Sequence, residues 1–279
     1  MSETAFVPGD EIGHYRLERL LGQGAMGLVF RATGNDGEPV ALKLLRPEHA
    51  ADSVSLARFV REARIVNGID PRHVVPILEL GEDRNLTYLA MPYYEGGSLM
   101  QRLRSSGSLG ADETVALAAQ LGRGLDELHR HGVLHRDVKP SNVLLDSEGR
   151  AALSDFGLAR AVDSTRLTAE GQILGTPHYL APELIEGLEA AKESDIYALG
   201  CVLYECVVGE PPFAGRSVTA VGFAHLAEEP PDPRDRRPEL SLDFAQAVLA
   251  PLAKDPAARP TSGTALARVL HVGRSAQPV

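Results

Sequence analysis

The sequence predicts an α+β fold of two lobes: a small antiparallel β-sheet lobe with one main helix, and a larger, mostly helical lobe. Short β-rich segments separated by turns fill the first third of the chain, which is typical of antiparallel sheet. After the glycine-rich turn at 95–98, apolar residues recur at helical spacing instead. We therefore expect a small lobe at residues 13–93 and a large lobe at 94–272, with tails at 1–12 and 273–279.

Composition limits the classes of function. The 279 residues are 44% hydrophobic and carry a net charge of −10, which is ordinary for a globular protein and unlike a basic nucleic-acid binder. We therefore expect no nucleic-acid partner. The N-terminus is polar and no segment is apolar over the thickness of a bilayer, so we expect a cytoplasmic chain without a membrane segment. Whether it is a full-length protein or one domain of a larger receptor is left open.

The small lobe has one segment with helical spacing and five with strand character. Phe59, Ala63 and Val66 are apolar at helical intervals within residues 55–67, and Gly68 follows the end. The predicted strands are 15–21, 27–33, 39–45, 74–80 and 86–93.

The large lobe has an amphipathic pattern at 111–130 and a nearly uniformly apolar one at 194–208. The second pattern predicts a buried central helix, which Ser194 can cap and Gly209 can end. Cys201 and Cys206 lie in it, and their spacing on a helix predicts two free, buried thiols. The remaining predictions are helices at 244–253 and 262–272, after an exposed Pro- and Arg-rich loop at 229–238.

Three glycines, Gly22, Gly24 and Gly27, follow the first predicted strand. Because they lack a Cβ, they allow the backbone to approach phosphate oxygens. Dinucleotide-binding folds use the same spacing, but a helix follows the glycines there. Here a predicted strand follows at 27–33, which favours a β-hairpin that covers phosphates; a plain β-turn with spare glycines is the alternative.

Lys43 lies on the predicted strand at 39–45. Side chains alternate along a strand, so Lys43 shares a face with Ala41, whose small side chain leaves room for a flat base. A lysine facing inward on an apolar strand needs a partner, and Glu62 on the following helix is the candidate. A surface pair between Glu62 and Arg58 is the alternative.

The run at 135–142, HRDVKPSN, is the most informative segment. It places Asp137, Lys139 and Asn142 in one loop, in an order suited to holding a hydroxyl, a phosphate and a metal ion. Lys139 and Lys43 are two of only four lysines, and arginine cannot replace a compact ammonium at a phosphate. Asp155 begins a second acidic turn further along the chain. Asp137 alone could be a turn residue, but that does not explain the whole run.

These motifs, in this order, resemble the protein kinase family, and specifically its bacterial serine/threonine branch, over about residues 13–272. The resemblance implies a bilobal protein-kinase-like fold and transfer of the γ-phosphoryl group of ATP to Ser/Thr hydroxyls of proteins. Asp137 would be the catalytic base, and Lys139 would neutralise the transferring phosphoryl group. Asn142 and Asp155 would ligate Mg²⁺, which prefers oxygen ligands.

The resemblance also implies a nucleotide pocket. The Pro92 carbonyl and the Tyr94 N–H would bond the adenine edge, and Glu62 would hold Lys43 against the α- and β-phosphates. Any apolar member of the pocket could, taken alone, be ordinary core. The expected nucleotide-binding residues are Leu21, Gly22, Gln23, Gly24, Ala25, Met26, Gly27, Val29, Ala41, Lys43, Met91, Pro92, Tyr94, Leu144 and Asp155.

The segment 156–180 resembles an activation loop. Arg136 is implied to bind a phosphate placed on it by autophosphorylation, and Thr176 is implied to bond the catalytic aspartate and lysine. A solvated polar loop is the alternative reading of its hydroxyls. The candidate phosphate acceptors are Ser164, Thr165 and Thr168, with the two threonines favoured.

Three further residues are implied to be structural. Arg259 would be the buried partner of Glu183, which closes the activation segment. Asp195, near the start of the predicted central helix, would hold the backbone of the catalytic loop.

Two rival functions remain beside the kinase. A pseudokinase would be expected to lack one of the four residues at positions 43, 137, 142 and 155, and all are present. Kinases of small molecules generally lack the Ala-Pro-Glu run at 181–183. The expected partners are protein substrates with Ser/Thr acceptors and a second copy bound through the small lobe. The motifs do not encode the substrates, the upstream signal or the oligomeric state.

Overall fold

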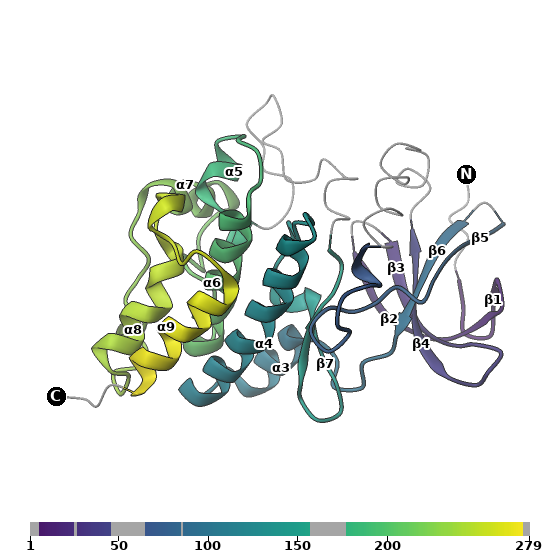
Figure 1. Ribbon diagram of the computed structural model, residues 1–279. Helices are drawn as coiled ribbons and strands as arrows, with labels where there is room; N and C mark the ends of the chain where they lie inside the picture. Colours follow the sequence, from purple (N-terminus) through teal and green to yellow (C-terminus); the bar gives the residue numbers. More distant parts are fainter. Residues whose placement is uncertain (1–5, 25–26, 46–64, 85, 157–176, 276–279) are drawn as a thin grey trace. The chain divides into compact units, whose positions relative to one another are not determined.

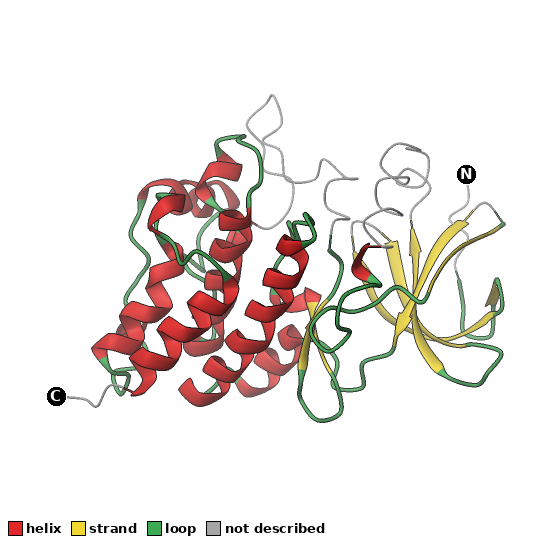
Figure 2. Cartoon of the chain, viewed as in Figure 1, coloured by secondary structure: helices red, strands yellow, loops and turns green. Residues whose placement is uncertain are grey.

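The computed structural model describes residues 6–24, 27–45, 65–84, 86–156 and 177–275 (Figures 1 and 2). The chain divides into two compact units. The first consists of residues 1–71 and 75–95, and the second of residues 72–74 and 96–279. The described part of the first is built on a β-sheet and that of the second is mostly helical, which confirms the predicted α+β class.

The first unit contains a six-stranded antiparallel sheet in the order β1-β2-β3-β4-β6-β5. Strands that follow one another in the chain pair as antiparallel hairpins, except β4 and β5. Hairpins are the usual connection in an antiparallel sheet. The strands are β1 (Glu11–Ile12), β2 (Tyr15–Gly24), β3 (Gly27–Thr33), β4 (Pro39–Leu45), β5 (Glu79–Asp83) and β6 (Leu86–Pro92).

The two faces of β4 carry different side chains, as the alternation predicted. Val40, Leu42 and Leu44 join the core cluster of the sheet, which also contains Phe30 and Tyr88. Neighbouring positions on a strand point to opposite faces, so Ala41 and Lys43 lie on the other face. The sheet therefore has one face committed to a core and one that carries the lysine.

The predicted strands at 27–33 and 39–45 match β3 and β4, whereas the prediction at 74–80 was wrong. β5 begins only at Glu79. The backbone at Ile77 is bonded by the Asn67 side chain instead, which donates to its carbonyl at 2.7 Å and accepts from its N–H at 2.9 Å. Hydrogen bonds to a side chain therefore take the place of strand-to-strand backbone hydrogen bonds at Ile77. The predicted helix at 55–67 lies mostly outside the described residues, and residues 65–66 are helical.

β1 lies in the segment expected to be a tail. Ile12 is fully buried in the sheet core and pairs with Tyr15, so apolar burial fixes this end of the chain to the sheet.

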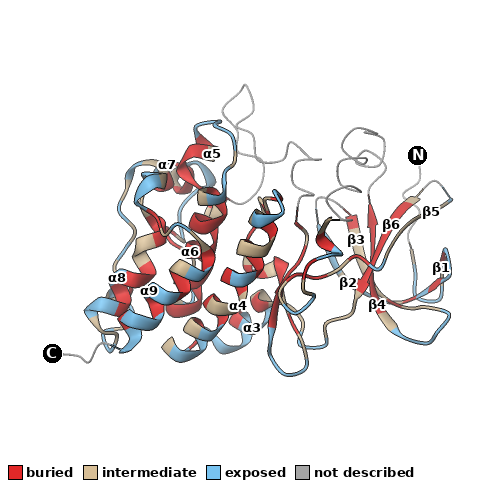
Figure 3. Ribbon diagram, viewed as in Figure 1, coloured by how far each residue is buried: buried red, intermediate tan, exposed pale blue. Residues whose placement is uncertain are grey.

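The second unit packs its helices around one buried helix, α6 (Lys192–Val208), which carries 14 buried residues (Figure 3). A helix that is apolar on all sides requires this position. The other described helices are α3 (Leu99–Ser106), α4 (Ala111–Arg130), α5 (Pro182–Ile185), α7 (Val218–Ala227), α8 (Leu242–Leu249) and α9 (Gly263–Ser275), beside a hairpin of β7 (Val143–Leu145) and β8 (Ala151–Leu153).

Helix α4 has the predicted bounds, but α6 begins two residues earlier than predicted. Ser194 is the third residue of the helix, and its side chain accepts a hydrogen bond from the N–H of Ala191, the residue before the helix. It therefore caps the start of α6 from within the first turn. Gly209 ends the helix with φ +93°, a conformation that glycine adopts readily. Cys201 and Cys206 are free and buried, as predicted.

The last two helices are shifted, and shorter ones were missed. Helix α8 runs over Leu242–Leu249, because Ser241 caps its start and a tight turn at Ala250–Leu252 follows. Helices α3 and α7 were not predicted. Each is short and begins after a capping serine, Ser98 or Ser217, which was the available sequence signal. None of the described helices is both long and apolar enough to cross a membrane.

Candidate active site

The loop at residues 135–142 is held by Asp195 at the start of α6. Its carboxylate accepts hydrogen bonds from the backbone N–H groups of His135, at 2.9 Å, and Arg136, at 2.8 Å. The His129 ring lies 2.7 Å from the same carboxylate. Burial by itself would raise the pKa of Asp195, but these hydrogen bonds and the neighbouring imidazoles hold it below its ordinary value. The expectation that Asp195 holds the loop backbone is confirmed.

The three polar residues of the loop are in direct contact. Lys139 Nζ lies 2.8 Å from Asp137 Oδ2, and Asn142 Nδ2 donates to the same oxygen at 2.9 Å. Asn142 also donates to the Asp137 carbonyl at 2.9 Å, and its side chain is buried. Both side chains therefore contact the same carboxylate oxygen, Oδ2, of Asp137.

Ser154 connects this loop to the acidic turn at Asp155. Its backbone N–H and its hydroxyl both donate to the Asn142 carbonyl, at 2.8 and 3.0 Å. Ser154 directly precedes Asp155, so the two expected metal ligands are linked through one residue. Asp155 has φ +60°, a left-handed conformation that turns the chain sharply after β8.

His135 lies beneath the loop and is fully buried. Its Nδ1 accepts the Asp137 N–H at 3.3 Å. Burial lowers the pKa of His135, against the opposing effect of Asp195 and Asp137, so the ring is a neutral support of the loop.

In the first unit, cross-strand pairing places the expected nucleotide residues in two rows. Gly22 pairs with Val29, Val29 with Lys43, and Lys43 with Leu89. Cross-strand partners share a face of the sheet. In the neighbouring row, Arg31 pairs with Ala41, and Ala41 pairs with Met91. Val29, Ala41, Lys43 and Met91 therefore lie together on the face opposite the sheet core.

The glycine-rich segment is a hairpin, as the sequence predicted. Gly24 pairs with Gly27, so β2 and β3 continue to the tip. Gly27 has φ +153° and has no room for a Cβ beside the Leu44 carbonyl. A larger residue at 27 would push this strand away from β4. Leu21, Gln23 and the three glycines of the segment lie on the same hairpin.

The remaining predicted site residues belong to neither row, and some of them lie outside the described residues. Pro92 ends β6, and Tyr94 follows two residues later. Leu144 lies on β7 in the second unit, where it bridges to Ser98. The residues outside the described ranges are Ala25, Met26, Glu62, Ser164, Thr165, Thr168 and Thr176.

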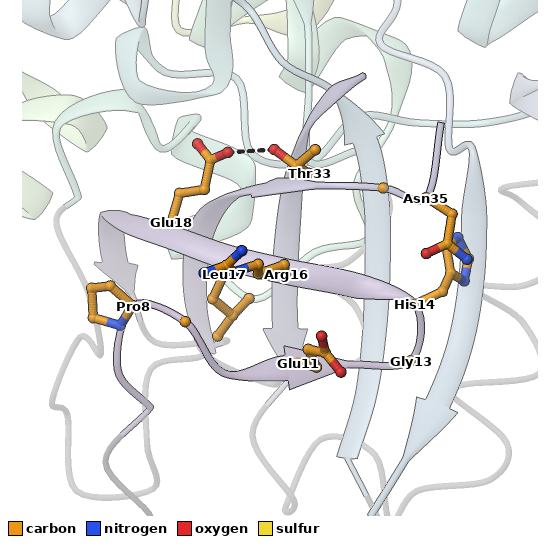
Figure 4. A pocket seen from close by; sticks show the side chains of 11 residues that line it. Pro8, Glu11, Gly13, His14, Arg16, Leu17, Glu18, Thr33 and Asn35 are labelled. Atoms are coloured by element: carbon orange, nitrogen blue, oxygen red, sulfur yellow. Dashed lines mark hydrogen bonds between the residues drawn. The ribbon is translucent and has the colours of Figure 1, made fainter. Parts of the chain in front are cut away.

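An open hollow of about 850 Å³ lies elsewhere on the first unit (Figure 4). Its described lining comes from residues 8–9, from β1, β2 and the turn between them, and from residues 33–35 at the end of β3. It includes none of the expected nucleotide-binding residues. Glu18 and Thr33, which are hydrogen-bonded to each other, are among the residues that line it. The hollow is therefore not the predicted nucleotide pocket.

The predicted buried pair of Glu183 and Arg259 is confirmed. Arg259 Nη1 and Nη2 donate to the two carboxylate oxygens at 2.8 Å each, and Ser194 donates to one of them at 2.7 Å. Burial alone would raise the pKa of Glu183, but Arg259 and Ser194 hold it below its ordinary value. A two-pronged arginine contact of this kind is both directional and strong.

Sequence reasoning missed three contributors. His129 supports Asp195, and Ser154 links Asn142 to Asp155. A histidine near the end of an amphipathic helix, or a serine before an acidic turn, carries no pattern that identifies such a role. Tyr93 was also missed, although it lies between two residues that were predicted to bond adenine.

The known proteins that this chain resembles include protein kinases. The protein kinase domain family matches residues 15–270. The chain is 39% identical over 97% of its length to the serine/threonine-protein kinase PknD of Mycobacterium tuberculosis, and 37% identical over 88% to PrkC of Bacillus subtilis. It covers 41% and 38% of those proteins. The crystal structure of the Mycobacterium tuberculosis PknI kinase domain superposes with a TM-score of 0.76 at 29% identity, covering 98% of this chain and 100% of that one.

The chain therefore belongs to the protein kinase domain family. Its similarity to PknD, PknE and PrkC confirms the predicted resemblance to bacterial serine/threonine-protein kinases, and the likeness to PknI confirms the protein-kinase-like fold. The chain spans about two fifths of the length of the curated relatives it matches.

Proposed function

We propose that this chain transfers the γ-phosphoryl group of ATP to serine and threonine hydroxyls of proteins. The observation that carries the proposal is the arrangement around Asp137, whose Oδ2 is contacted by both Lys139 and Asn142. The other oxygen, Oδ1, would accept the proton of the hydroxyl. That arrangement is the set of groups that phosphoryl transfer needs: a base, a cation and an oxygen ligand for a metal.

The residues fit ATP and Mg²⁺ as cofactors. The two amide hydrogens of Asn142 are used within the loop. Its side-chain oxygen accepts a 3.3 Å hydrogen bond from the Ser141 hydroxyl and has a second lone pair that a cation would take. Asp155 follows the Ser154 link and adds a carboxylate. Mg²⁺ takes oxygen ligands and commonly keeps waters and phosphate oxygens, so two protein ligands are sufficient. When bound, MgATP supplies the phosphoryl group.

The protein's own groups would then position the acceptor hydroxyl and neutralise the negative charge of the phosphates. Asp137 accepts the proton of the acceptor hydroxyl, for which general-base catalysis contributes roughly 10²- to 10⁴-fold. Lys139 balances the negative charge of the transferring group, and Lys43 does the same at the α- and β-phosphates with Glu62 as its partner. Val29, Ala41, Met91 and Leu144 would contact the adenine ring.

We also propose regulation by autophosphorylation. Thr165 and Thr168, with Ser164 as a third candidate, would take a phosphate that faces Arg136. Phosphosite mapping of active protein should find at least one of the two threonines modified. Dimerisation through the first unit and a cytoplasmic location remain predictions.

The direct test is incubation of the protein with ATP labelled on its γ-phosphate, Mg²⁺ and a generic protein substrate. The parent should label the substrate on serine or threonine, and Asp137→Asn should reduce labelling by roughly 10²-fold or more. Asp112→Asn is the matched control, because Asp112 is exposed and pairs with Arg274 at the surface.

Two outcomes contradict the proposal. MgATP binding without labelling by the parent would favour a pseudokinase. Labelling of an aminoglycoside or another small alcohol in preference to protein would favour a small-molecule kinase.

A further inference from the structure

We propose that Arg19, Arg31 and Tyr93 form a positioning clamp for the adenine-binding segment at 92–94. The inference rests on the proposed ATP site and adds to it three residues that the motifs do not contain. All three belong to the first unit, so the clamp is complete within one compact body.

The ring of Tyr93 is held by two guanidinium groups. Arg19 Nη2 donates to the Tyr93 hydroxyl at 2.7 Å. Arg31 lies over the ring, with its Cζ 5.3 Å from the ring centroid, and Arg19 Cζ lies 6.0 Å from it. A cation over an aromatic face is attracted by the ring quadrupole, so these contacts fix both the plane and the tip of the side chain.

The position of Arg31 is itself fixed. Its guanidinium forms an ion pair with Glu18, and Glu18 also accepts a hydrogen bond from the Thr33 hydroxyl (Figure 4). The side chains of Glu18 and Arg31 are about one third exposed. The ion pair already restricts the side-chain rotamers of Arg31 within the sheet. Arg31 therefore loses less conformational entropy when it contacts the ring of Tyr93.

Strand register places the clamp beside the expected adenine pocket. Arg19 pairs with Arg31, Arg31 with Ala41, and Ala41 with Met91. These four positions form one row across the same face of the sheet. The two arginines therefore share this row with Ala41 and Met91, the two residues that are expected to contact the base.

The clamp acts where backbone pairing stops. The ladder between β4 and β6 ends with the pair Val40 and Pro92, and Pro92 has no N–H to extend it. The atoms expected to bond adenine are the Pro92 carbonyl and the Tyr94 N–H, on either side of Tyr93. Anchoring the Tyr93 side chain thus orients the two backbone groups that flank it.

The test compares nucleotide binding by the parent, Tyr93→Phe and Tyr93→Ala. Tyr93→Ala removes both contacts and should weaken binding of MgATP by roughly tenfold, while Tyr93→Phe keeps the ring and should lose about two- to threefold. Because the defect acts at the base, affinity for adenosine should fall by the same factor as affinity for MgATP. KM for ATP should rise, with KM for the protein substrate unchanged.

Arginine variants provide the rescue and the control. Arg31→Met should weaken MgATP binding and Arg31→Lys should restore most of it, because lysine keeps a cation near the ring. Arg16→Ala is the matched control, since Arg16 is an exposed arginine on β2, the strand that carries Arg19, and lies outside the clamp. If Tyr93→Ala does not fold, Tyr93→Phe and the Arg31 pair decide the question.

Failure of this inference is distinguishable from failure of the proposed function. A parent that does not bind MgATP contradicts the proposed function. A parent that binds, with Tyr93→Ala and Arg31→Met binding equally well, contradicts the clamp alone. Loss of MgATP affinity without loss of adenosine affinity also contradicts the clamp, because the defect would then lie at the phosphates.

Discussion

Asp195 accepts a 2.8 Å hydrogen bond from the backbone N–H of Arg136, a residue held at φ +66°. A non-glycine residue in this left-handed region is strained by roughly 1–3 kcal/mol, and such strain persists only where the surroundings fix it. The second hydrogen bond, from the His135 N–H, and the contact with His129 supply that constraint. The buried carboxylate therefore sets the backbone geometry from which Asp137 projects.

The first prediction concerns this carboxylate. Asp195→Asn should lower kcat by roughly 10- to 100-fold, because an amide nitrogen cannot accept one of the two backbone N–H bonds and leaves it unsatisfied. The variant should also unfold at a lower urea concentration than the parent. Glu193→Gln, in the first turn of the same helix, is the control and should behave like the parent. An Asp195→Asn protein with unchanged kcat would contradict the scaffolding role.

The second prediction concerns the Ser154 link. Ser154→Ala removes the 3.0 Å hydroxyl bond to the Asn142 carbonyl and keeps the 2.8 Å bond from the backbone N–H. One such hydrogen bond contributes about 1 kcal/mol, so the Mg²⁺ concentration for half-maximal activity should rise by about three- to tenfold.

A control for this variant is Ser106→Ala, which removes a comparable serine bond on an exposed helix end. Equal Mg²⁺ dependence of both variants and the parent would show that Ser154 does not position the proposed metal ligands, Asn142 and Asp155.

The third prediction concerns Glu183 and Arg259. Arg259→Met leaves the buried Glu183 carboxylate with the Ser194 hydroxyl as its remaining partner among the described side chains, and should cost roughly 3–5 kcal/mol in the free energy of unfolding. Glu183→Gln should cost less, because the Arg259 guanidinium keeps backbone carbonyls of Ala253, Glu193 and Lys254 as acceptors. Additive losses in the double variant would contradict direct coupling of the pair.

The elements best predicted from the sequence are those whose local pattern and tertiary role agree. The 111–130 pattern gave helix α4 with its bounds, because one face is apolar and the ends carry suitable charges. β3 and β4 were predicted equally well, since their alternation matches a sheet with one buried face. The prediction of a strand at 74–80 was wrong because the Asn67 side chain, which lies outside that segment, bonds the backbone N–H and carbonyl of Ile77.

The site divides in the same way. Asp137, Lys139 and Asn142 are close in sequence, so a motif identifies them together. Support from His129 and Ser154 depends on tertiary packing. The pairing of Arg19 with Arg31 depends on the register of β2, which contains a bulge between Leu17 and Arg19. No local pattern encodes that register, so the contacts to Tyr93 could not be predicted.

The last prediction concerns His225, a fully buried histidine on α7. Burial, followed by the positive charge of Lys254, lowers its pKa to about 3. The Tyr197 hydroxyl lies 2.8 Å from its Nδ1, and Lys254 donates to its carbonyl at 2.9 Å. His178 is the other titratable group that acts on it, and Phe213 packs against the ring. The folded protein therefore holds this imidazole neutral.

The sign of the pH dependence follows from that state. Below the ordinary histidine pKa of about 6.5, the unfolded chain binds a proton that the folded chain does not, so stability falls as pH decreases, by about 1.4 kcal/mol per unit. Between pH 6.5 and pH 5, His225 alone should remove about 2 kcal/mol from the free energy of unfolding.

Urea unfolding from pH 7.5 to pH 5 checks this, with His225→Asn as the comparison. Asparagine keeps an acceptor for the Tyr197 hydroxyl and cannot take up a proton, so the variant should lose less stability on acidification than the parent. The buried His135 contributes the same acid sensitivity to both proteins and cancels in the difference. Parallel pH profiles for the two proteins would contradict a neutral His225, since a histidine leaves the slope unchanged only when it takes up its proton equally in the folded and unfolded states.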